Sequence, residues 1–141
     1  MMRLLAIDYG KKRTGIAVSD SLQLIANGLT TVETKTLLPF LQDYLSHEQV
    51  ERFILGLPIQ PNGRPSENQA RVRSFAGQLA KAFPNIPIEF YDERFTSVLA
   101  HQTMLDSGIG RKRRRDKALV DEIAATIILQ GYMESRRIHS F

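Results

Sequence analysis

The sequence predicts an α/β protein built on a five-stranded mixed sheet with helices on both faces. Two observations predict this class. Three strand-like segments with short links open the chain, which is typical of an antiparallel meander. Strand-like and helix-like segments then alternate, so the later strands should run parallel to the first through right-handed crossovers. The expected order is β-β-β-α-β-α-β-α-α, and we expect residues 1–141 to form a single domain.

The meander occupies the first part of the chain. Residues 3–9, 14–19 and 28–33 are predicted strands, because apolar and β-branched side chains dominate them. Gly10 and Gly15 stand at the edges of the first turn. We expect both glycines to supply the backbone freedom that folds the second strand back beside the first.

The remainder of the chain contains the alternating part. Thr36 is expected to cap a helix over 37–47, and a buried strand over 52–57 follows it. Ser66 and Gln69 have the spacing of a capping box, which predicts the start of a second helix. This helix and the later elements are expected over residues 66–83 (helix), 86–92 (strand), 98–106 (helix) and 119–136 (helix).

Composition narrows the class of protein. The chain has no cysteine, which excludes disulfides, thiolate zinc sites and a cysteine nucleophile. No apolar run approaches the ~20 residues that span a bilayer, and the N-terminus lacks a signal-peptide pattern. We therefore expect a cytoplasmic protein with no membrane association.

The positive charge is concentrated in one segment. The net charge is +4, and the other residues together are close to neutral once residues 111–117 are set aside. Such a pattern favours a polyanion partner such as nucleic acid, although a solvated loop is the structural alternative. The predicted nucleic-acid-binding residues are those of this segment and of the first turn: Arg111, Lys112, Arg113, Arg114, Arg115, Lys117, Lys11, Lys12 and Arg13.

Acidic residues mark the expected ligand-binding edge of the sheet. Asp8 ends the first strand, and Asp92 and Glu93 end the last strand, where ligands gather in parallel sheets. Alternation along the strand directs only one of Asp92 and Glu93 toward Asp8 and does not decide which. Asp121 lies on the apolar face of the last helix near its start, so it could face Asp8 across the sheet.

Carboxylates from separate segments form a hard oxygen site, which prefers Mg²⁺ or Mn²⁺. Two such ions can activate water and stabilise the leaving oxygen in phosphodiester hydrolysis. Structural roles are the alternatives: Asp8 could cap the turn, Glu93 could pair with Arg94, and Asp121 could interact with the helix dipole.

Four blocks of sequence together resemble the YqgF/RuvX family. They are residues 6–20, residues 56–58 with 68–76, residues 91–97, and residues 120–132. The resemblance implies a ribonuclease H-like fold and a cytoplasmic bacterial nuclease that matures the 5′ end of 16S ribosomal RNA. An older assignment is Holliday junction resolution. It also implies Asp8, Glu93 and Asp121 as catalytic and metal-binding residues, which selects Glu93 over Asp92. Asn62 departs from the acid that relatives often carry before the glycine, which puts a ligand role for loop 60–65 in doubt.

The expected function is therefore metal-dependent endonucleolytic cleavage of precursor ribosomal RNA. Three alternatives stay open at this point: a resolvase acting on branched DNA, a non-catalytic RNA-binding assembly factor, and a nucleotide-binding ATPase. The last requires two such domains around a nucleotide, whereas 141 residues supply one. The sequence is compatible with a monomer or a homodimer.

Overall fold

The computed structural model describes residues 2–60, 62–93 and 117–139. The expected helix over 98–106 and the basic residues 111–116 lie outside these ranges. Across the described ranges, no helix combines the length and the apolar character needed to cross a membrane.

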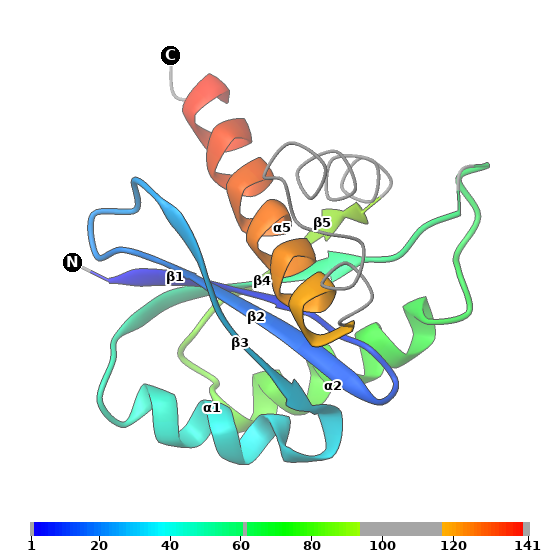
Figure 1. The fold of residues 1–141 in the computed structure, drawn as a ribbon, viewed down its shortest axis with the longest axis horizontal. Coiled ribbons are helices and arrows are strands. Elements are labelled where there is room, and N and C mark those ends of the chain that lie inside the picture. Colours follow the sequence, from blue (N-terminus) through cyan, green and yellow to red (C-terminus); the bar gives the residue numbers. More distant parts are fainter. Residues whose placement is uncertain (1, 61, 94–116, 140–141) are drawn as a thin grey trace.

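The sheet contains five strands in the order β3-β2-β1-β4-β5 (Figure 1). Strand β2 pairs antiparallel with both β1 and β3, whereas β4 pairs parallel with β1 and β5. The mixed sheet predicted from the sequence is thus confirmed. The strands are β1 (Arg3–Asp8), β2 (Arg13–Ser19), β3 (Ala26–Glu33), β4 (Val50–Leu57) and β5 (Ile88–Asp92).

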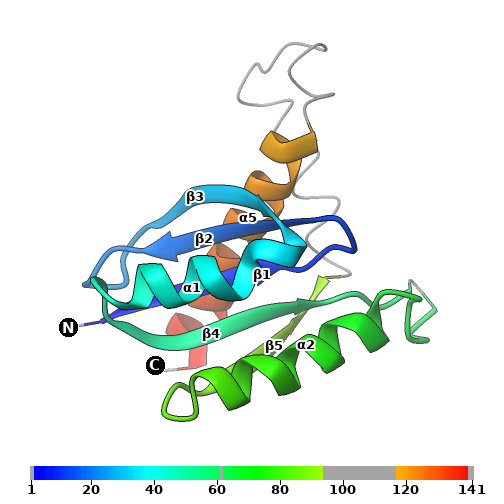
Figure 2. The same ribbon diagram turned by 90° about the horizontal axis from the view of Figure 1, so that it is seen from below.

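Helices cover both faces of the sheet, as expected. Figure 2 shows α1 and α2 on one side and α5 on the other. A short 3₁₀ helix, η1, connects β3 to α1. The bounds are η1 (Thr34–Thr36), α1 (Leu37–Leu45), α2 (Gln69–Ala82) and α5 (Lys117–His139).

The predicted capping box is wrong. Helix α2 follows Asn68, which makes no side-chain capping bond. The Ser66 hydroxyl instead donates to the carbonyl oxygen of Pro58 at 2.9 Å, so it closes the preceding loop. Thr36 does precede α1, but its hydroxyl donates to Glu33 O at 2.7 Å and does not cap the helix. Both hydroxyls therefore bind carbonyl oxygens of preceding residues instead of capping a helix.

Strand β1 is buried on both faces, which explains its continuous apolar sequence. Leu5 and Ile7 belong to the core beneath α1 and α2. Leu4 and Ala6 belong to the core beneath α5. Because side chains alternate along a strand, Asp8 continues the row that faces α5. The same alternation therefore determines on which face the candidate site forms.

Candidate active site

Asp8 stands between two glycines of the neighbouring strands. On one side it pairs with Gly15 in the antiparallel β1–β2 ladder. On the other side Ile7 pairs with Leu55, so Gly56 lies at the level of Asp8 on β4. The sheet thus carries no side chain on either side of this carboxylate, which leaves room for other groups to approach.

Asp121 approaches over Gly15. A β-carbon on Gly15 would overlap the backbone carbonyl of Asp121 and would lie 3.1 Å from the backbone nitrogen of Glu122. Helix α5 therefore packs with its backbone directly on β2. The sequence predicted a turn role for Gly15, but Gly15 lies within β2 and provides space instead. Gly10 keeps the predicted turn role, because a β-carbon there would overlap the carbonyl of Arg13.

Glu93 approaches over Gly56. A β-carbon on Gly56 would overlap the Glu93 carboxylate and would lie 2.6 Å from Cδ1 of Ile128 on α5. Glu93 follows β5 directly and lies on the α5 side of the sheet, together with Tyr91, which packs in the core beneath that helix. The structure therefore places Glu93 beside Asp8, as the family resemblance implied.

The carboxyl groups of Asp8 and Glu93 both have raised pKa values. Burial, assisted by the charge of Asp8 and a hydrogen bond with it, raises the pKa of Glu93 to about 9. Burial also raises the pKa of Asp8, and the charge of Asp121 adds to this effect. The hydrogen bond with Glu93 acts on the pKa of Asp8 in the opposite direction. Glu93 is therefore the protonated partner at neutral pH, and it donates to Asp8.

Asp121 has a counter-ion that the sequence did not predict as one. The Nε–H of Arg13 donates to Asp121 Oδ2 at 3.0 Å. Arg13 and Gly15 are two positions apart on β2 and therefore lie on the same face of the sheet. The packing of α5 on Gly15 thus brings Asp121 within reach of Arg13. Among the residues that the structure describes, no group of three acidic or histidine side chains is arranged to hold a metal ion.

The predicted basic residues are only partly described. Lys11 and Lys12 are exposed at the β1–β2 turn, next to Arg13. Lys117 is the first residue of α5. The predicted contacts of Arg111, Lys112, Arg113, Arg114 and Arg115 lie outside the described residues.

Ile59 and Gln60, which follow β4, lie beside Pro65 and Arg64, so the chain turns back near the end of β4. A bridge pairs Ile59 with Pro65, and the Gln60 backbone N–H donates to Arg64 O at 2.8 Å. Asn62 Oδ1 accepts from Arg64 N at 3.0 Å, and Gly63 has a φ of 85°. Asn62 is thus used to shape the turn, which gives this departure from the family pattern a local structural role.

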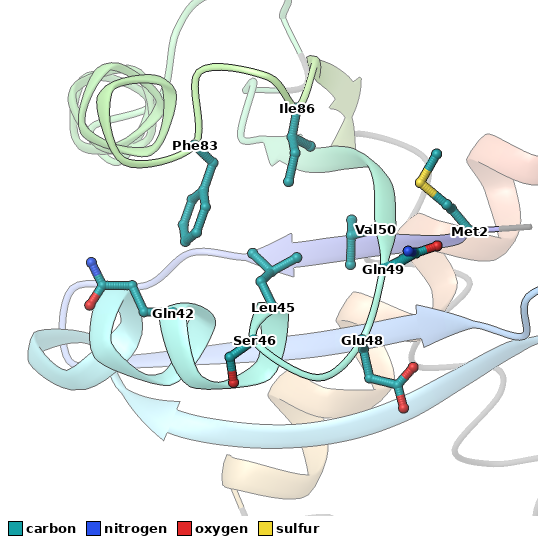
Figure 3. Close-up of a pocket in the computed structure, with 9 residues that line it drawn as sticks. All are labelled: Met2, Gln42, Leu45, Ser46, Glu48, Gln49, Val50, Phe83 and Ile86. Atoms are coloured by element: carbon teal, nitrogen blue, oxygen red, sulfur yellow. The ribbon is translucent and has the colours of Figure 1, made fainter.

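A cavity of about 540 Å³ lies away from these carboxylates (Figure 3). Met2 and Val50, at the amino ends of β1 and β4, line it together with Leu45, Phe83 and Ile86. It therefore opens at the opposite end of the parallel strands from Asp8. Its lining is mainly apolar, and the candidate active site is not there.

The order of the strands and the helices on both faces define a ribonuclease H-like protein. A solved structure of Thermus thermophilus RuvC with a Holliday junction substrate aligns over 97% of this chain and 96% of that chain, with a TM-score of 0.57 and 17% identity. A fowlpox virus resolvase with Holliday junction DNA aligns over 95% of this chain and 98% of the resolvase, with a TM-score of 0.56 and 14% identity. At these identities the similarity establishes the fold.

The sequence comparisons establish the family. The model of the RuvX family, described as "Holliday junction resolvase", matches residues 2–135. A relative from Bacteroides thetaiotaomicron is 62% identical over 137 residues, 97% of this chain and 99% of its own. A relative from Flavobacterium johnsoniae is 53% identical over 97% of this chain and 99% of its own length. Both relatives carry the name "Putative pre-16S rRNA nuclease". The chain belongs to the RuvX family of nucleases, and the resemblance seen in the sequence is confirmed.

Proposed function

We propose that this nuclease is a metal-dependent endonuclease that cleaves precursor 16S ribosomal RNA during maturation of its 5′ end. The observation that carries the proposal is the convergence of Asp8, Glu93 and Asp121 from three separate elements over Gly15 and Gly56. The name of the relatives at 53–62% identity supports the choice of RNA.

The carboxylates have the donor chemistry that a hard divalent cation prefers, and the described side chains would have to draw closer together to hold one. Asp8, Glu93 and Asp121 would hold Mg²⁺ or Mn²⁺, which prefer oxygen ligands. The raised pKa values of Asp8 and Glu93 fit this role, because the charge of a nearby cation would offset the desolvation and the repulsion that favour protonation. The chemistry that such a group supplies when bound is activation of a water molecule and stabilisation of charge on the phosphate.

The chain's own basic residues would position the substrate. Lys11 and Lys12 are exposed on the turn that follows Asp8, so they can hold a phosphate backbone beside the carboxylates. The basic segment 111–117 would extend this contact. Because such contacts are electrostatic, nucleic-acid binding should weaken steeply as the salt concentration rises.

The test compares Asp8→Asn with Asp43→Asn, a matched change at an exposed position of α1. With Mg²⁺ or Mn²⁺ and precursor ribosomal RNA, we expect Asp8→Asn to abolish cleavage while folding and RNA binding persist, and Asp43→Asn to cleave like the wild type. Wild-type cleavage by purified Asp8→Asn would refute the assignment of this site.

The family description favours a second candidate, a resolvase of branched DNA. A four-way DNA junction incubated beside the ribosomal RNA separates the two, since the carboxylates serve either substrate. A resolvase must cut two strands symmetrically, so it should sediment as a two-fold dimer. Binding of RNA without cleavage of either substrate would instead indicate a non-catalytic assembly factor.

We also propose that the whole chain works as one nuclease domain in the cytoplasm. The family model supports the first part, because its match extends from residue 2 to residue 135. The proposed ribosomal RNA substrate supports the second part, because that RNA is made and processed in the bacterial cytoplasm.

A further inference from the structure

A second cavity, of about 490 Å³, adjoins the candidate active site at the β1–β2 turn. Four of the residues that line it are basic and one is acidic: Lys11, Lys12, Arg13, Lys35 and Glu33. Lys35 comes from η1, which lies far from the turn in the sequence and next to it in the fold. The cavity therefore gathers positive charge from two elements.

Hydrogen bonds hold these two elements together. The Thr34 backbone N–H donates to Lys12 O at 2.9 Å, and the Thr34 hydroxyl donates to Gly10 O at 2.7 Å. The fully buried Thr14 hydroxyl is hydrogen-bonded to that of Thr34 at 2.9 Å. Lys35 follows Thr34 directly, so its backbone is fixed relative to the turn. The backbone segments that carry the basic side chains are thus fixed relative to each other.

The charge of Lys35 is available to a ligand. Its Nζ lies 3.3 Å from Glu33 Oε2, with the two side chains 81% and 66% exposed. Ion pairs this exposed contribute little to stability, because water solvates both partners and screens their attraction. A phosphate can therefore replace Glu33 as the partner of Lys35 without unfavourable desolvation.

Arg13 connects this cavity to the carboxylates. It lines the cavity, and its Nε–H donates to Asp121 Oδ2 at 3.0 Å. The guanidinium is a planar fork with five N–H donors, a shape that suits both carboxylate and phosphate. The Arg13 side chain can therefore bind either the Asp121 carboxylate or a phosphate in the cavity.

We propose that this cavity binds a backbone phosphate of the nucleic-acid substrate, and that Arg13 couples this phosphate to the cation site. The coupling rests on the proposed function, since it takes Asp121 as a cation ligand. In the metal-free protein Arg13 neutralises Asp121. If Asp121 held a cation, its carboxylate would no longer need Arg13, and the guanidinium would be free to bind the phosphate. Cation and substrate therefore strengthen each other's binding, and Arg13 is a positioning residue.

The cavity is tested by Lys35→Gln against Lys81→Gln, which removes the same charge from the last turn of α2. Binding of a short fluorescein-labelled single-stranded RNA to metal-free protein is measured by anisotropy over a salt series. For Lys35→Gln we expect at least about threefold weaker binding, and a salt slope smaller by about 0.7, the value for one lost phosphate contact. Lys81→Gln should match the wild type. Equal behaviour of the two variants would overturn the proposal.

The coupling is tested by Arg13→Gln and Arg13→Lys, with Ca²⁺ in place of Mg²⁺ and intact RNA verified on a gel. In the wild type we expect Ca²⁺ to raise RNA affinity by about fivefold or more. This Ca²⁺-dependent increase in RNA affinity should be several-fold smaller in Arg13→Gln. In Arg13→Lys, which keeps the charge but lacks the planar guanidinium, it should lie between those of the wild type and Arg13→Gln. An equal gain in all three proteins would overturn the coupling.

A second readout needs no RNA and no cleavage. The NMR signal of Arg13 Nε–H should move when Ca²⁺ is added to the wild type, because its bond to Asp121 is broken. A stationary signal at saturating Ca²⁺ would refute the release of Arg13. These binding measurements are independent of cleavage, so a failure of the Asp8→Asn test would leave their outcome interpretable.

Discussion

Replacing Gly15 by alanine tests the packing that brings the carboxylates together. The added methyl group would overlap the carbonyl of Asp121 and would lie 3.1 Å from the nitrogen of Glu122. Both obstructing groups belong to the helix backbone, which cannot rotate away as a side chain can. Helix α5 must therefore move away from β2.

The cost follows from what this movement separates. Ala125 and Ile128 of α5 are fully buried, and they pack in one cluster with Ala17 and Ile54 of the sheet. Overpacking of a well-filled core costs about 1–3 kcal/mol, and we expect the upper half of this range because the overlap is with backbone. For a chain of this length that corresponds to a fall in Tm of about 6–12 °C.

Thermal and urea unfolding, followed by far-UV circular dichroism, measure this difference. Gly77→Ala is the matched control. Gly77 lies in α2, and a β-carbon there would meet nothing within 4 Å. The control should be stabilised by about 0.5–1 kcal/mol, because alanine favours the helix. A Gly15→Ala protein within about 0.5 kcal/mol of the wild type would show that α5 does not rest on Gly15, and would remove the basis for placing Asp121 beside Asp8.

Two further predictions concern Gly56 and Asp20. The methyl group of Gly56→Ala would overlap the Glu93 carboxylate and crowd Cδ1 of Ile128, which are both ends of side chains and not backbone. We therefore expect cleavage to fall by about tenfold or more, with a smaller loss of Tm than Gly15→Ala shows. Unchanged cleavage rates would contradict the role of Glu93. Backbone N–H groups of Ile25, Leu24 and Leu22 lower the pKa of Asp20 below its ordinary 3.8. The stability advantage of the wild type over Asp20→Asn should therefore be fully present above pH 3.8 and disappear as the pH falls through the lower folded-state pKa, which urea titrations at several pH values measure; a gap that widens in acid would contradict this reasoning.

The fold was largely predictable because its strongest signals are local. The apolar run of β1 and the helical spacing of Ile128 and Tyr132 on α5 each have one good structural solution, and the strand and the helix predicted there are both confirmed. The capping box failed because Ser66 had a competing acceptor, the carbonyl of Pro58, which becomes available only when the loop folds. A short motif does not reveal such a competitor.

The candidate residues of the site could be named from the sequence, but their arrangement could not be predicted from it. Strand alternation placed Glu93 and Asp92 on opposite faces, and only the family resemblance chose Glu93. The bond between Arg13 and Asp121 joins residues 108 positions apart. It depends on how closely α5 packs on Gly15, and a strand sequence does not contain that distance. A glycine inside a predicted strand was nevertheless a usable signal, since it often marks a close approach of another backbone.

The arrangement also explains how the fold tolerates three carboxylates in one place. Two of the negative charges are compensated locally. Protonated Glu93 donates a hydrogen bond to Asp8, and the guanidinium of Arg13 pairs with Asp121. These two contacts are also the ones that the proposed divalent cation would have to replace. The proton of Glu93 and the position of Arg13, in addition to the number of carboxylates, would therefore determine how readily the site accepts that cation.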